Sequence, residues 1–190
     1  MKFINRYKKG EYEYASYNKK KTWIITAILY LLSAAIYITG YVTTGSNKNL
    51  LTIVAILGIL PASKALIVAI MNMRVRILPL DLKKEIDDSI GGLKGYYHLY
   101  LTSYEFNYYL AHLVVTKDSL ICYTDDKKFD FKQFDAHMEK HMGIEGIEGI
   151  VIKVFTNHES YVSRLRQLNA THQADQTNEK LCKLLTNISL

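Results

Sequence analysis

Two long apolar runs separated by only seven residues constrain this chain more than any other feature. The first run, Trp23 to Val42, contains no Asp, Glu, Lys or Arg, and the second run, Leu50 to Met71, contains one charged residue, Lys64. A helix of about 20 residues rises about 30 Å, which matches the hydrocarbon core of a bilayer. The residues between the runs are too few for anything but a tight turn. We therefore predict a membrane hairpin of two antiparallel transmembrane helices, 23–42 and 50–71.

The distribution of positive charge predicts how this hairpin is oriented. Residues 1–22 hold seven basic and two acidic residues, the turn holds Lys48 as its only basic residue, and Arg74 and Arg76 follow the second run. Loops rich in Lys and Arg stay on the cytoplasmic side of a membrane. We therefore expect both termini in the cytoplasm and the turn outside. Trp23 stands where an interfacial aromatic anchor belongs.

The formal net charge of +6 is carried by the membrane-proximal part of the chain. Residues 1–22 carry seven basic and two acidic residues, net +5, whereas residues 74–190 carry 15 basic and 16 acidic residues, net −1. The C-terminal region thus lacks the basic excess expected of a nucleic-acid binder. We predict a basic cytoplasmic juxtamembrane segment at 1–22 that lies on anionic lipid, the hairpin at 23–71, and a cytoplasmic domain at 74–190.

Small residues form one stripe along the second apolar run. Their spacing alternates between three and four residues, at Ala55, Gly58, Ala62, Ala65 and Ala69. Small stripes let membrane helices approach closely. This stripe packs either against the first helix or against another copy of the chain or a partner subunit.

Lys64 interrupts the second run and lies about 140° around the helix from the small stripe. Its ammonium either snorkels to the headgroups or pairs with a carboxylate of another membrane protein. Tyr30 of the first run lies at about the depth of Lys64. If Lys64 faced Tyr30, the small stripe would have to face a third helix.

The region after the hairpin is long enough for one domain with its own core. We expect Asp81 to cap its first helix, and the C-terminal helix either to cover this domain or to bind a partner. The predicted elements are a helix at 82–90, strands at 96–101, 108–115 and 119–124, a helix at 130–142, a strand at 149–155, a helix from 158 and a helix at 177–188. The order αβββαβα predicts a cytoplasmic α/β domain with a mixed sheet and helices packed on it, because a helical crossover joins the last two strands.

Few residues of the domain carry recognisable chemistry. His137 and His141 are four residues apart on a predicted helix and could hold a divalent metal with His112 as a third ligand. The alternative is a solvated helix edge. Cys122 and Cys182 are expected as free thiols in the cytoplasm. No nucleophile elbow, kinase set or phosphate-binding loop is present, so the sequence predicts no cofactor beyond this weak metal possibility.

Two resemblances extend this interpretation. The segment from Asn49 to Lys64, together with Phe155-Thr156 and residues 164–169, resembles small two-span membrane proteins of Gram-positive anaerobic bacteria. That resemblance implies a location in the bacterial cytoplasmic membrane and no assigned activity. The order αβββαβ resembles the restriction-endonuclease-like core, a family that holds a metal with an acidic-x-Lys motif on its third strand. Glu85 could match that family's helix carboxylate, but residues 119–124 read SLICYT and lack the motif.

We therefore favour a non-enzymatic function for this chain. The leading hypothesis is a membrane-anchored adaptor or accessory protein whose cytoplasmic domain binds another protein or a second copy. The alternative is a membrane-tethered hydrolase or nuclease-like enzyme, either with or without a metal. The residues expected to contact membrane or partner are Lys64, Tyr30, Gly58, Ala62, Ala65 and Trp23.

Overall fold

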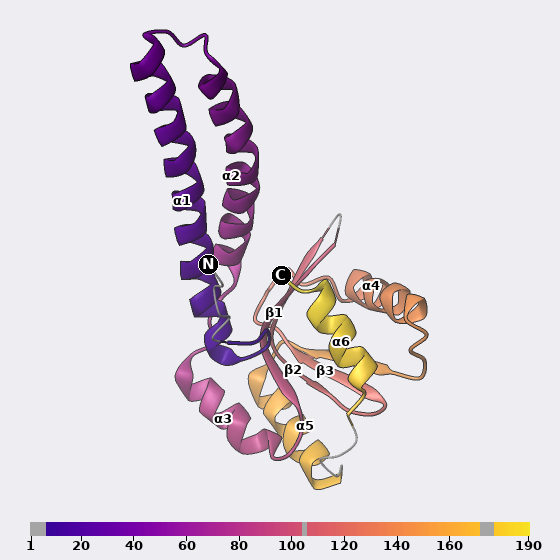
Figure 1. Ribbon diagram of the computed structural model, residues 1–190. Coiled ribbons are helices and arrows are strands. Elements are labelled where there is room, and N and C mark those ends of the chain that lie inside the picture. Colours follow the sequence, from indigo (N-terminus) through magenta and orange to yellow (C-terminus); the bar gives the residue numbers. More distant parts are fainter. Residues whose placement is uncertain (1–6, 104–105, 172–176) are drawn as a thin grey trace. The chain divides into compact units, whose positions relative to one another are not determined.

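The computed structural model describes residues 7–103, 106–171 and 177–190 (Figure 1). The chain divides into two compact units. One unit is a helical hairpin, Ala15–Arg74, and the other joins the N-terminal residues through Tyr14 to Val75–Leu190. The second unit is an α/β domain.

The hairpin consists of two long apolar paired helices, α1 (Tyr12–Thr44) and α2 (Leu50–Arg74). Both are long and apolar enough to span a membrane. α2 agrees with the predicted run, whereas α1 begins well before Trp23. The extension is rich in lysine, a good helix former, so the helix does not stop where the apolar run begins.

Asn49 shapes the connection between the two helices. Its side-chain Oδ1 accepts a hydrogen bond from the backbone N–H of Thr52 at 2.8 Å, and its Nδ2 donates to the carbonyl of Ser46 at 2.7 Å. The first bond satisfies an N–H at the start of α2 that has no partner within the helix. The predicted tight turn is therefore confirmed, with Asn49 as the residue that ends it.

The α/β domain contains a mixed four-stranded sheet in the order β1-β2-β3-β4. The strands are β1 (Gly95–Thr102), β2 (Asn107–Val115), β3 (Ser119–Tyr123) and β4 (Val151–Phe155). β1, β2 and β3 are antiparallel neighbours, whereas β3 and β4 are parallel. The parallel pair follows from the connection through α4 (Phe131–Ile144), because such a pair needs a crossover. The predicted mixed sheet is confirmed.

Three further helices complete the predicted order. They are α3 (Leu80–Ile90), α5 (His158–Thr171) and α6 (Glu179–Ile188). Asp130 caps α4 and Asn178 caps α6 through side-chain hydrogen bonds to backbone N–H groups. The predicted Asp81 cap of α3 is wrong: the residue before that helix is Pro79, and no side chain caps it. Asp81 lies instead in the first turn, where a carboxylate still meets the positive end of the helix dipole.

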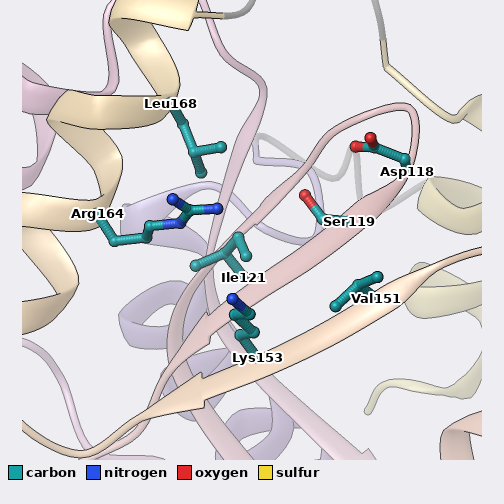
Figure 2. A pocket seen from close by; sticks show the side chains of 7 residues that line it. All are labelled: Asp118, Ser119, Ile121, Val151, Lys153, Arg164 and Leu168. Carbon is teal, nitrogen blue, oxygen red and sulfur yellow. The ribbon is translucent and has the colours of Figure 1, made fainter.

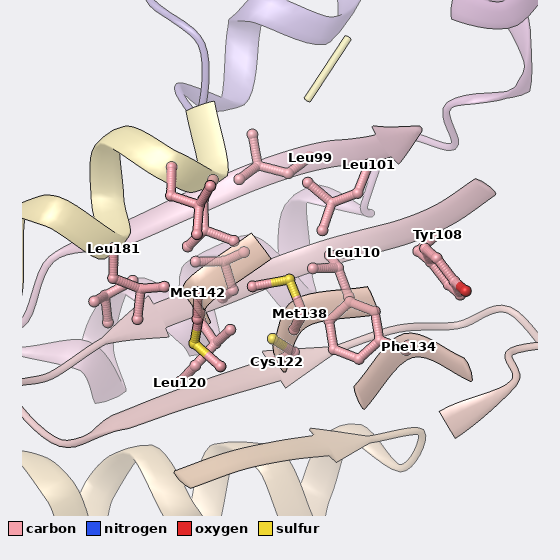
Figure 3. Close-up of a cluster of buried hydrophobic side chains, with 14 of the residues drawn as sticks. Leu99, Leu101, Tyr108, Leu110, Leu120, Cys122, Phe134, Met138, Met142 and Leu181 are labelled. Atoms are coloured by element: carbon pink, nitrogen blue, oxygen red, sulfur yellow. The ribbon is translucent and has the colours of Figure 1, made fainter. Parts of the chain in front are cut away.

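Helices cover both faces of the sheet (Figure 1). α3 and α5 contact each other on one face, and α4 and α6 contact each other on the other. Figure 3 shows the core beneath α4 and α6, where Leu101, Leu110, Phe134, Met138 and Leu181 are fully buried. Since α6 contributes to this core, the structure confirms that the C-terminal helix covers its own domain.

The side chains of β1 switch from one face of the sheet to the other at His98. This residue has a φ of 54°, in the left-handed region that non-glycine residues rarely adopt. After His98, Leu99 pairs with Leu110, and both side chains enter the core under α6. Before His98, Tyr97 pairs with His112 on the opposite face of the sheet. There Tyr97 contacts α3 and His112 contacts α5. β2 is apolar on both faces because it is an inner strand of a sheet that helices cover on both sides.

Both ends of the described chain lie along the outer edge of β1. The backbone N–H of Tyr97 donates to the carbonyl of Gly10 at 2.7 Å, and Leu190 donates to the carbonyl of Tyr100 at 3.0 Å. The Lys9 ammonium donates to the carbonyl of Ser189 at 2.7 Å, where a cation favours the negative end of α6. This part of the predicted lipid-facing segment 1–22 is therefore integrated into the domain. Residues 1–6 lie outside the described residues.

Gly10→Ala is expected to lower domain stability by about 1–3 kcal/mol. Gly10 has a φ of 90°, and a Cβ there would collide with the Tyr96 ring. The measurement is the thermal unfolding midpoint of the full-length protein in detergent. Gly143→Ala is the matched control, because open space surrounds that helical position. Equal midpoints for the two variants would contradict the packing of Gly10 on β1.

Candidate functional site

The hairpin presents a hollow around Lys64 that is apolar apart from two groups. Its volume is about 300 Å³, and Ile25, Pro61 and Val68 form most of its wall. The Thr22 hydroxyl at one side already donates to the carbonyl of Asn18 at 2.9 Å. Lys64 is exposed and makes no ion pair within the described chain. The hollow therefore offers one uncompensated positive charge within a nonpolar surface.

Tyr30 does not face Lys64. Its hydroxyl lies 3.5 Å from Ser63 Oγ, and its ring lines a second hollow of about 340 Å³ with Ser33, Ala55 and Ile59. The residues predicted to contact a partner thus divide between different surfaces of the hairpin. Trp23 is 42% exposed.

The small stripe of α2 faces α1. Ala62 and Ala69 are fully buried, and a Cβ on Gly58 would come within 2.7 Å of Ser33 Oγ. Thr26 and Ser33 are buried on the facing side of α1. The stripe therefore packs within the hairpin, and the geometric reason to expect a third helix does not hold.

The three histidines suggested as metal ligands are not brought together. His137 and His141 are adjacent on α4, with ring centroids 4.5 Å apart. His112 lies on the other face of the sheet, against Tyr161 of α5. Within residues 7–103, 106–171 and 177–190, no three His, Cys, Asp or Glu side chains form a group suited to a metal ion. The predicted metal set is therefore wrong as a three-ligand site.

His112 belongs instead to a buried polar cluster. Its Nδ1 lies 2.6 Å from the Tyr161 hydroxyl, and its ring lies 4.4 Å from the Tyr97 ring centroid to centroid. The Tyr97 hydroxyl donates to Asp87 Oδ1 at 2.6 Å. Burial lowers the pKa of His112 to about 3, so this imidazole stays neutral in the folded protein at neutral pH. No spacing in the sequence could have revealed this cluster, since its members come from α3, β1, β2 and α5.

Glu85 is engaged on the surface of α3. Its carboxylate lies 3.6 Å from His158 Nε2 and 3.9 Å from Arg166 Nη2. β3 is buried in the middle of the sheet and carries no carboxylate, with Leu120 and Cys122 fully buried. Glu85 thus has His158 and Arg166 beside it, and β3 supplies no acidic side chain of the kind that the nuclease-like motif requires.

Comparison of the chain with protein-family models, curated proteins and solved structures found no match.

His112 is expected to make the domain less stable in mild acid. The unfolded chain protonates this histidine below about pH 6.5, whereas the folded chain does not until about pH 3. Its contribution is therefore complete above the unfolded pKa and is lost as the pH falls, by about 1.4 kcal/mol per pH unit. The thermal unfolding midpoint of the full-length protein, followed from neutral pH to about pH 5, measures this loss.

Two variants test that assignment. His112→Gln should flatten the pH dependence, while His158→Gln should leave it nearly unchanged, because His158 lies at the surface beside Glu85. An identical pH dependence in wild type and His112→Gln would refute the role of His112.

Proposed function

We propose that this chain is a membrane-anchored accessory protein. The α1–α2 hairpin crosses the bacterial cytoplasmic membrane with both ends in the cytoplasm, and the α/β domain binds another protein there. The observation that carries the proposal is the large aliphatic surface that the hairpin leaves uncovered. Leu31 and Leu60 are 69% and 68% exposed, and Val42 is 74% exposed.

The hairpin has the opposite arrangement from a water-soluble helix pair. Small and hydroxyl side chains fill its interior, whereas Leu, Ile and Val point outward. Only 17% of the residues in the apolar stretch of each helix are buried. Apolar surface in water costs about 25 cal/mol per Å², so a bilayer is the environment that fits both helices. Small residues between membrane helices permit close van der Waals contact.

Lys64 supports the second part of the proposal, a partner within the membrane. A charge inside a bilayer is expensive and usually pairs with an opposite charge. The hollow beside Lys64 is apolar and open, which suits a helix of another membrane protein that carries one Asp or Glu. A snorkelling lysine would need no such partner, and the two cases differ in whether removing the charge loses a bound protein.

Site-specific labelling should place the turn and the domain on opposite sides of the membrane. Both native cysteines are buried, with 0% and 4% exposure, so they give little background labelling. Ser46→Cys in the turn should react with a membrane-impermeant maleimide in intact cells. Lys140→Cys on α4 should react only after the membrane is opened. The reverse pattern would invert the proposed orientation, and labelling of both in intact cells would exclude it.

Lys64→Met should release a membrane partner that wild type retains. The protein is purified from its own membranes in mild detergent, and proteins that accompany it are quantified by mass spectrometry. The loss should reach at least about tenfold, as expected for a desolvated charge pair. Leu60→Met is the matched control, because it changes an exposed residue of the same helix without changing charge. Equal recovery with both variants would remove Lys64 from the proposal.

A further inference from the structure

The face of the sheet under α5 contains a hollow that the membrane-anchored function does not use. It lies between α5, β3 and β4 and has a volume of about 230 Å³. Ile121 and Leu168 form its apolar wall, and Ser119, Lys153 and Arg164 supply most of its polar groups (Figure 2). Pockets for drug-sized ligands have volumes of about 300 Å³ or more. This hollow is smaller, so only a small ligand would fit in it.

Two cations from different elements converge on this hollow. Arg164, from α5, and Lys153, from β4, both line the hollow, and Figure 2 shows the Ile121 side chain between the guanidinium and the ammonium in this view. Within the described chain, neither group forms an ion pair. Arg164 Nη1 donates to Gln167 Oε1 at 3.2 Å, and Arg164 Nε is buried without a hydrogen-bond partner among the described residues. The lining therefore carries two positive charges that have no ion-pair partner within the described residues.

The nearest carboxylate is attached to the turn before β3. Asp118 Oδ1 accepts a hydrogen bond from the Thr116 hydroxyl at 3.1 Å, and Thr116 Oγ1 also lies 2.6 Å from Ser119 Oγ. These bonds fix Asp118 at the rim and position the Ser119 hydroxyl beside the hollow (Figure 2). The lining therefore holds two cations against one carboxylate and remains net positive.

We infer that this hollow binds the phosphate group of a small soluble phosphate monoester. Arginine presents a planar fork of donors that matches phosphate oxygens, and lysine adds a compact point charge. A dianion bound beside Lys153 and Arg164 would offset the positive charge of the lining.

Isothermal titration calorimetry of the full-length protein in detergent tests this assignment, with glycerol phosphate and inorganic phosphate as probes. Both should bind, and Lys153→Gln and Arg164→Gln should each weaken binding by about tenfold or more, as expected for charge-assisted hydrogen bonds. Arg164→Lys should also weaken binding, because it keeps the charge but loses the planar fork. Lys140→Gln, a charge change on α4 at the other face of the sheet, should bind like wild type.

Three results would overturn the inference. The first is no binding at about 10 mM probe, a concentration at which even a millimolar site would be filled. The second is equal weakening by Lys140→Gln, which would indicate general charge attraction. The third is a response to nanodiscs that contain phosphatidic acid without any response to glycerol phosphate, which would make the ligand a lipid headgroup. Unchanged thermal unfolding midpoints must accompany any loss of binding in the variants.

Discussion

Close contact between α1 and α2 depends on small side chains, and the properties of the hairpin follow from that contact. Ala62 and Ala69 have no exposed surface, and Gly58 leaves room only for the Ser33 hydroxyl. Filling the interior with alanine, glycine and hydroxyl residues forces the larger aliphatic side chains outward. The same choice that joins the helices therefore creates the apolar exterior of the hairpin. Ala62 and Ala69 are thereby enclosed within the hairpin, whereas Ala65 lines the hollow beside Lys64.

In the α/β domain, one small sheet is covered by helices on both faces. The left-handed backbone at His98 redirects β1, so that Leu99 and Tyr97 enter different layers. The edge of β1 is then partly paired by the Gly10 and Leu190 segments, which limits the strand surface open to other chains. Lys9 adds to this arrangement because its ammonium meets the end of α6. Lys9 and Gly10 are thus structural parts of the domain.

The sequence was sufficient for features that depend on local pattern. Apolar length predicted the two helices, and alternating turn signals and apolar runs predicted the order αβββαβα with a mixed sheet. It was insufficient where distant residues decide the outcome. Charge predicted that residues 1–22 lie on lipid, which stays a prediction, and it gave no indication that Gly10 pairs with Tyr97 across a large sequence separation. Likewise, the spacing of His137 and His141 suggested a metal, while the third candidate, His112, lies across the sheet with Tyr161. The Lys153–Arg164 hollow gave no sequence signal, because only the packing of α5 on β4 creates it.

Both units contain positive charges without an ion-pair partner among the described residues. The dielectric around each charge determines how strongly it favours a bound counter-charge. Two unit charges at 4 Å interact by about 1 kcal/mol in water and by about 4 kcal/mol at the effective dielectric near a protein surface. Lys153 and Arg164 reach solvent, so their hollow can stay empty at little cost and fill when an anion is available. Lys64 has an apolar wall, and in lipid its charge would have no water to screen it. A carboxylate partner for Lys64 would therefore be held continuously, whereas a ligand of the domain would exchange. Under the two proposals, the hairpin would thus belong to a stable membrane complex, whereas the domain would respond to a soluble molecule.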